Sequence, residues 1–198
     1  RTHSDNTELL TAWQGEEKVT LDVEHLRLLD PGVTAGLVQH AVDEDYKHLG
    51  YVEREDTKTA VFAFLTVMKP GDLVLTEHVT YTGMKAIASL LHLQLRGLPL
   101  DGNGLIPEAF EAACREAAPR ALYCMPTLQN PTARTMPLER RQAIADIAAR
   151  HEVALIEDDV YGLLPEQPLP PLTAIAPAHA YYITSTSKSM APGLRVGY

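Results

Sequence analysis

The sequence predicts an α/β protein with a mostly parallel sheet and helices on both faces of that sheet. From residue 70 onward, short apolar runs rich in β-forming residues alternate with segments of helical periodicity, which is the order of repeated βαβ units. Polar clusters directly follow several of these runs, where parallel sheets place their functional sites. The 198 residues, 45% of them hydrophobic and 22% charged, suffice for one large domain with its own core.

Five apolar runs are predicted as strands because each is short and rich in Leu, Ile, Val, Ala or Tyr. They cover residues 73–76, 93–98, 121–125, 153–157 and 181–185. Helical segments separate the first four runs at residues 82–91, 107–118 and 138–151. Since a helix lies between successive strands, the strands are expected to pair in parallel.

The helix predicted at 138–151 has an apolar stripe flanked by arginines. The stripe consists of Ile144, Ile147 and Ala148, and the flanking residues are Arg140, Arg141 and Arg150. Further helices are expected at residues 34–48 and 60–68, before the first strand of the alternating pattern.

The acidic charge of the chain lies in its first quarter. Residues 1–56 have a net charge of −8, out of −9 for the whole chain. We therefore treat 1–56 as an acidic N-terminal segment of uncertain fold and 57–198 as the α/β domain. An acidic segment is poorly suited to binding a nucleic-acid backbone, because such binding requires a surplus of Lys and Arg.

The expected location is cytoplasmic, without a membrane partner. The longest uncharged stretch, residues 167–187, is broken by prolines and cannot be a transmembrane helix. The first twenty residues lack the pattern of a secretory signal. Two cysteines, Cys114 and Cys124, cannot build a disulfide framework.

Two polar clusters follow the third and fourth predicted strands. In residues 129–132, Asn130 either directs its side-chain amide into a cleft or only stabilises a turn. In residues 157–161, three consecutive acids close an apolar strand, either as solvated loop residues or helix caps, or with one buried carboxylate opposite a cationic ligand atom. In the second case Tyr161 would turn toward the same pocket.

A third cluster runs from Ser185 to Lys188 and continues to Arg195. A lysine in this setting can form a Schiff base, while the hydroxyls and the guanidinium hold a phosphate. A lone lysine is usually a solvated surface residue. The occurrence of all three clusters in one order, at successive strand ends, favours the functional interpretation.

This order of motifs resembles the pyridoxal-phosphate-dependent aminotransferases of fold type I (class I/II), close to the aminotransferase domain of MocR/GntR-type regulators. The resemblance covers residues 69–198. Its landmarks are Pro70-Gly71-Asp72, Glu77 to Gly83, Asp101 to Leu105, Tyr123 to Thr132, Arg140-Arg141, Glu157 to Tyr161 and Ser185 to Tyr198.

The resemblance implies a pyridoxal 5′-phosphate cofactor, amino acid and 2-oxo acid substrates, and a homodimer. It makes Lys188 the internal aldimine lysine, which later moves a proton between substrate and cofactor. It pairs Asp158 with the pyridinium nitrogen, which maintains the electron sink of the ring. The other implied contacts are Tyr81 on the ring face, Asn130 and Tyr161 at the 3′ oxygen, and Ser185, Ser187 and Arg195 at the phosphate.

The sequence departs from the family pattern at several positions. Ala133 and Val79 stand where many members have Gly and Pro. Residues 55–58 occupy the spacing of the Gly-rich phosphate cup, and a cup-like stretch at 33–36 lies too far upstream. The family's C-terminal small domain, with the arginine that clamps the substrate carboxylate, is expected to be missing because the chain stops at Tyr198. We therefore expect either a fragment, in which 57–198 is an incomplete large domain, or a sequence that lacks internal segments.

The main alternative is a ligand-sensing domain of a MocR/GntR-type transcriptional regulator with little turnover, because catalysis and sensing share one cofactor site. Residues 32–54 faintly resemble a winged helix, but their acidic surroundings argue against DNA contact, so DNA would be bound through a domain not evident in this chain. A serine acyl enzyme using Ser185 and Lys188 is rejected because Pro192-Gly193 would break the required helix. No metal site is predicted, since no histidine pair has ligand spacing.

Overall fold

The computed structural model describes residues 10–14, 17–21, 63–64 and 66–190. At its centre is a five-stranded sheet of order β4-β3-β7-β8-β9, in which every neighbouring pair is parallel. The strands are β3 (Leu73–Glu77), β4 (Gln94–Leu98), β7 (Ala121–Cys124), β8 (Ala154–Asp158) and β9 (Ala180–Ile183). The predicted α/β class and parallel pairing are confirmed.

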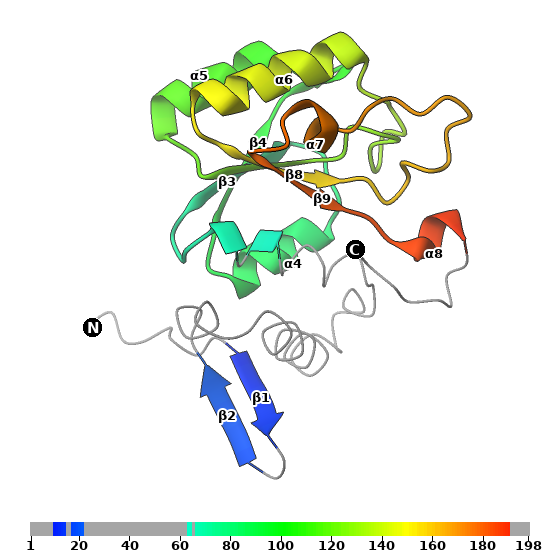
Figure 1. The fold of residues 1–198 in the computed structure, drawn as a ribbon. Helices are drawn as coiled ribbons and strands as arrows, with labels where there is room; N and C mark the ends of the chain where they lie inside the picture. The colour runs from blue at the N-terminus through cyan, green and yellow to red at the C-terminus, as the bar shows by residue number, and fades with distance from the viewer. Residues whose placement is uncertain (1–9, 15–16, 22–62, 65, 191–198) are drawn as a thin grey trace.

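Helices cover both faces of this sheet. In Figure 1, α5 and α6 lie side by side on one face and α4 lies on the other. These helices are α4 (Gly83–Leu90), α5 (Pro107–Ala117) and α6 (Leu138–Arg150), all at their predicted positions. Two shorter helices, α7 (Leu172–Ile175) and α8 (Thr186–Ser189), are not predicted, because so short a segment carries no readable periodicity.

Alternation along the central strands divides the core into two layers. On β7, Leu122 packs with residues of α5 and α6, whereas Tyr123 packs with residues of α4. On β8, Leu155 and Ile156 repeat this division. A strand that is buried on both faces needs apolar residues at successive positions, which explains the continuous apolar runs in the sequence.

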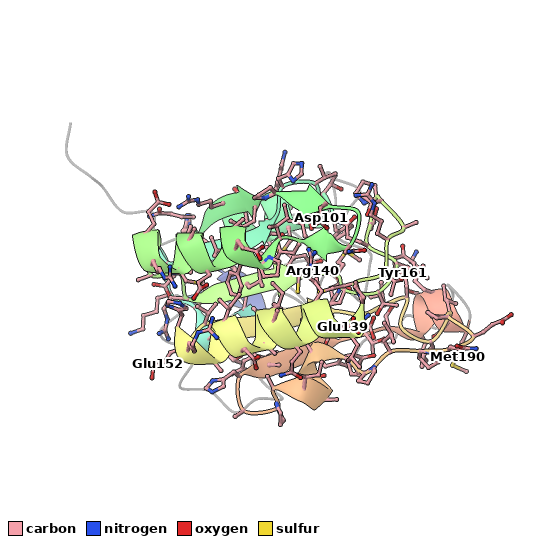
Figure 2. All side chains as sticks on the ribbon, turned by 90° about the horizontal axis from the view of Figure 1, so that it is seen from above. Asp101, Glu139, Arg140, Glu152, Tyr161 and Met190 are labelled. Atoms are coloured by element: carbon pink, nitrogen blue, oxygen red, sulfur yellow. The ribbon has the colours of Figure 1, made fainter. Side chains whose placement is uncertain are left out.

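A small hairpin that the sequence analysis missed precedes α5. It pairs β5 (Leu100–Asp101) with β6 (Gly104–Leu105), and the backbone N–H of Asn103 donates to the Asp101 carboxylate at 2.7 Å. The Arg140 guanidinium on α6 donates to both oxygens of Asp101, at 3.1 and 3.0 Å. Figure 2 shows the Asp101 and Arg140 side chains close together. These bonds tie the hairpin to α6.

The acidic N-terminal segment contributes one described feature, an antiparallel pair of β1 (Leu10–Gln14) and β2 (Glu17–Leu21). The helix expected at 34–48, the cup-like stretch at 33–36 and the boundary at residue 56 lie outside the described residues. Residues 63–64 and 66–67 are helical, within the helix expected at 60–68. In the described part of the chain, no helix combines the length and apolar character needed to cross a membrane.

Two details of the sequence analysis are wrong. The last predicted strand extends to Ser185, but β9 ends at Ile183 and Ser185 directly precedes α8. Arg141 does not flank the apolar stripe of α6 but belongs to it, with a fully buried side chain. Ile144 and Ala148 lie three and seven residues further on, which places them on the same helical face as Arg141.

Candidate functional site

The sequence-predicted site residues follow four neighbouring strands. Because β3, β7, β8 and β9 are adjacent and parallel, their carboxyl ends share one edge of the sheet. Tyr81 follows β3, Asn130 follows β7, Asp158 ends β8, and Lys188 follows β9. Open α/β sheets bind their ligands at this edge. The topology therefore brings together residues that are far apart in the sequence.

The three acids that close β8 are buried, so the solvated-loop interpretation is wrong. Glu157, Asp158 and Asp159 are 0%, 4% and 5% exposed. Alternation along the strand turns Asp158 toward the α4 face and Glu157 toward the α5 and α6 face. Glu157 accepts hydrogen bonds from the backbone N–H groups of Leu172 and Thr173, at 2.9 and 3.0 Å.

The Asp158 carboxylate is bound by a tyrosine on the neighbouring strand. The Tyr123 hydroxyl donates to Asp158 Oδ2 at an O–O distance of 2.5 Å, and both side chains are buried. Burial raises the pKa of the Tyr123 phenol well above its usual range, and the nearby Asp158 charge raises it further. The phenol therefore stays protonated and remains a donor.

Asp159 has a separate environment. It accepts a hydrogen bond from the Tyr182 hydroxyl at 2.9 Å, and its carboxylate occupies the space that a side chain at Gly162 would need. Burial raises the pKa of the Asp159 carboxyl, partly offset by hydrogen bonds from Thr127 and Tyr182. The two adjacent aspartates thus have different tyrosine donors.

The loop that carries Asn130 is bonded to the loop that carries Tyr81. Gln129 donates through Nε2 to the Val79 carbonyl at 2.7 Å and accepts at Oε1 from the Thr132 hydroxyl at 2.6 Å. Gln129 is buried and Asn130 is half-buried. Because the Gln129 amide reaches both loops, it fixes the position of Asn130 relative to Tyr81.

Both predicted tyrosines lie on the α4 side of the sheet. The Tyr81 ring is buried over Gly83, where a Cβ atom would collide with it, so this close approach requires glycine. Tyr161 is half-buried and packs against the same core cluster as Tyr81. In Figure 2, Tyr161 lies toward the same end of the molecule as Met190, opposite Glu152, which precedes β8.

The hydroxyl cluster lies at the start of α8. Ser185 is buried, and its Oγ lies 2.8 Å from Ser187 Oγ. Lys188 is half-buried on the same short helix. This arrangement agrees with a lysine placed among hydroxyls directly after a strand. Arg195, the remaining predicted phosphate ligand, lies outside the described residues.

The family model for aminotransferase class I and II matches residues 55–198. The chain belongs to this family. The Bacillus subtilis (strain 168) protein "Uncharacterized HTH-type transcriptional regulator YdeF" is 41% identical to it over 133 residues, which cover 67% of this chain and 29% of that protein. "Aminotransferase swnA" of Metarhizium robertsii is 36% identical over 143 residues, covering 65% of this chain and 29% of that protein. The chain thus spans under a third of the length of these relatives.

Solved aminotransferase structures share the fold. Kynurenine aminotransferase of Pyrococcus horikoshii, crystallised with PMP, superposes with a TM-score of 0.67 and 27% identity, covering 73% of this chain and 38% of that one. LysN, the α-aminoadipate aminotransferase of Thermus thermophilus, was solved with N-(5′-phosphopyridoxyl)-L-leucine. It gives a TM-score of 0.66 and 25% identity, covering 79% of this chain and 43% of that one. The predicted fold-type-I resemblance is confirmed.

In this aminotransferase-family chain, a buried arginine connects the loops behind the site. Arg141 on α6 donates to the Met136, Pro170 and Pro126 carbonyls at 3.0, 3.0 and 3.2 Å, and lies 4.0 Å from Glu157. Sequence reasoning used Arg141 as a landmark but missed its role. Its i, i+3, i+7 spacing with the apolar stripe is the signal that could have placed it in the core.

A second residue behind the candidate site is Glu77, at the end of β3. Burial raises the pKa of Glu77 to about 7, although the Met125 N–H, Gln129 and Thr80 donate to its carboxylate and lower it. A cavity of about 350 Å³ opens beside Glu77 and Tyr81, at the ends of β3 and β4. Sequence reasoning took Glu77 only as a family landmark, because nothing in its local sequence indicates that it is buried.

Proposed function

We propose that this chain is part of a pyridoxal-phosphate-dependent aminotransferase that moves an amino group between an amino acid and a 2-oxo acid. Pyridoxal phosphate is the cofactor that the family match and the phosphopyridoxyl-bound neighbour indicate. The observation that carries the proposal is the buried Asp158 carboxylate between the Asn130 loop and the Lys188 helix, at the ends of adjacent strands.

The side chains at this edge of the sheet match the chemical groups of pyridoxal phosphate. A buried carboxylate such as Asp158 suits a protonated ring nitrogen, because an uncompensated buried charge is costly. The Asn130 amide and the Tyr161 hydroxyl suit the 3′ oxygen. The hydroxyls of Ser185 and Ser187 suit the phosphate, since they can donate to its oxygens.

When bound, the cofactor supplies the electron sink for chemistry at the substrate Cα. The residues of the chain hold and orient the reacting groups. In this proposal Lys188 Nζ would hold the cofactor covalently until the substrate amine replaces it, and the released Lys188 amine would then move the proton at the substrate Cα. Asp158 keeps the ring nitrogen protonated, and Tyr81 covers the ring face.

A second function is favoured by the regulator relatives. The 41% identical protein is named as an HTH-type transcriptional regulator, so the same site in this chain could serve a ligand sensor with little turnover. Catalysis and sensing need the same cofactor contacts. The two functions differ in whether a 2-oxo acid is released repeatedly.

The test is an absorbance and labelling experiment on the full-length protein. Reduction with borohydride should attach the cofactor to Lys188, as found by mass spectrometry of a protease digest. Lys188→Ala should abolish the labelling, whereas Lys69→Ala, at an exposed position before β3, should leave it unchanged. Stoichiometric labelling at another lysine would overturn the assignment of Lys188.

Addition of amino acids then distinguishes the two functions. Repeated production of a 2-oxo acid supports the aminotransferase. A single spectral change without sustained product supports the sensor. Absence of any cofactor uptake by the wild-type protein would overturn both.

A further inference from the structure

We propose that Tyr123 is a positioning residue for the candidate active site, whose phenol holds the Asp158 carboxylate ready for the cationic ring nitrogen of the cofactor. This inference rests on the proposed function, because it assigns a task to a residue behind the cofactor-binding carboxylate. None of the motif-based site assignments includes Tyr123.

Strand register brings the two side chains to one face. Tyr123 on β7 pairs with Ile156 on β8, and Asp158 lies two residues further along β8. Residues two apart on a strand point to the same face. The Tyr123 side chain therefore reaches diagonally across the strand pair to Asp158 Oδ2, where the O–O distance is 2.5 Å.

Packing in the core also holds the Tyr123 ring in place. The Tyr123 ring is 1% exposed and lies against the Phe64 ring, with centroids 6.1 Å apart and planes inclined by 33°. A ring held in this way has few alternative rotamers. The hydroxyl is therefore directed at Asp158 by the surrounding core rather than by solvent.

The hydrogen bond has two consequences for Asp158. A neutral donor stabilises the charged form of a buried carboxylate, which would otherwise be costly to keep ionised. It also fixes the orientation of the carboxylate, while the two oxygens together retain capacity for further donors. Both effects prepare Asp158 for a protonated ring nitrogen.

The neighbouring aspartate offers a matched control. Asp159 accepts from the Tyr182 hydroxyl at 2.9 Å, so Tyr182→Phe removes the same kind of hydrogen bond one residue away. Tyr123→Phe removes only the hydroxyl and keeps the ring that packs on Phe64. The two variants thus separate an effect on Asp158 from the general loss of a tyrosine–aspartate bond.

The experiment titrates each full-length variant with pyridoxal phosphate and follows its absorbance against pH. Tyr123→Phe should weaken binding about tenfold, because the binding step must then also order the Asp158 carboxylate. It should also raise the pH midpoint of the absorbance band of the Lys188-bound cofactor by about 0.5 unit. Without the Tyr123 hydroxyl, Asp158 holds the proton on the ring nitrogen less firmly, and the nitrogen of Lys188 then keeps its own proton to a higher pH. Tyr182→Phe should change both quantities little.

A third measurement needs no cofactor. Urea unfolding of the cofactor-free wild type, Tyr123→Phe, Asp158→Asn and the double variant should give a coupling of about tenfold in the unfolding constant.

The outcomes distinguish the claims. If Tyr123→Phe leaves both the pH midpoint of the absorbance band and the affinity for pyridoxal phosphate unchanged, while the wild type binds normally, the positioning role is overturned. A coupling near zero would overturn the interaction itself. Failure of the wild type to bind pyridoxal phosphate, with the coupling intact, would instead overturn the proposed function and the task assigned to Tyr123.

Discussion

The Glu77 carboxylate at the end of β3 accepts a hydrogen bond from the backbone N–H of Met125, just after β7, at 3.1 Å. This bond connects the ends of two neighbouring strands directly before the loops that carry Tyr81 and Asn130. Glu77 is 1% exposed, and burial raises its pKa from an ordinary value of 4.5 to about 7. The bond therefore joins the two loops through a group that titrates near neutral pH.

The first prediction concerns the pH dependence of stability. Because the folded-state pKa of Glu77 is raised, the folded protein binds more protons than the unfolded chain between pH 4.5 and 7. The contribution of protonated Glu77 to the free energy of unfolding is fully present below pH 4.5 and is lost as the pH rises to about 7. The loss should amount to about 3 kcal/mol in the free energy of unfolding.

Glu77→Gln tests this by urea unfolding at about pH 5 and about pH 8, on either side of most of this titration. Gln129 and Met125 can still donate to the amide oxygen, but no charge has to be buried, so the variant should lose less stability between the two pH values than the wild type. Burial also raises the pKa of Glu157 and Asp159, so only the difference between variant and wild type reports on Glu77. Exposed Glu108→Gln is the control. Equal pH dependence in Glu77→Gln and wild type would contradict the prediction.

The second prediction distinguishes the two aspartates. Asp158→Asn should reduce transamination by about 100-fold or more, because in the proposed function it removes the charge that faces the ring nitrogen. Asp159→Asn should have a far smaller effect, since that side chain binds Tyr182 instead. Single-turnover rates with a panel of amino acids provide the measurement. Equal losses in the two variants would remove the distinction.

The third prediction concerns the buried arginine. Arg141→Met should lower the free energy of unfolding by about 3–5 kcal/mol, because it removes the cation beside the buried Glu157 carboxylate and leaves several carbonyl oxygens without this donor. Arg150→Met, on the same helix, should have little effect, because Arg150 is 55% exposed and pairs with Glu111 at the surface. Chemical denaturation of both variants checks this. Similar stability of the two variants would show that the interactions of Arg141 add little to stability.

The fourth prediction concerns assembly. We expect the intact protein to be a homodimer. The family resemblance implies an active site to which both subunits contribute across a two-fold axis, and isologous dimers are the commonest closed oligomers. Light scattering of the full-length protein across a range of concentrations measures this directly. An active monomer at every concentration would contradict it.

Local sequence patterns were sufficient for the α/β class and the main helices. The strands around Leu122 and Leu155 are buried on both faces, so their apolar runs are continuous and easy to recognise. The clusters at Asn130, Asp158 and Lys188 were also recognisable, because each directly follows such a run. Short elements such as α7 and the Asp101 hairpin escaped detection, because their formation depends on contacts with α6 and β8.

The sequence by itself thus determined which segments form the sheet and which residues lie at its carboxyl edge. Only the tertiary structure decided that Glu77 and Arg141 are buried and that Tyr123 binds Asp158. Those facts depend on strand order and side-chain direction across the sheet, which join residues 35 positions apart in the case of Tyr123 and Asp158. Periodicity reports only on the nearest neighbours along the chain, whereas the burial of a charge depends on the layers that fold over it.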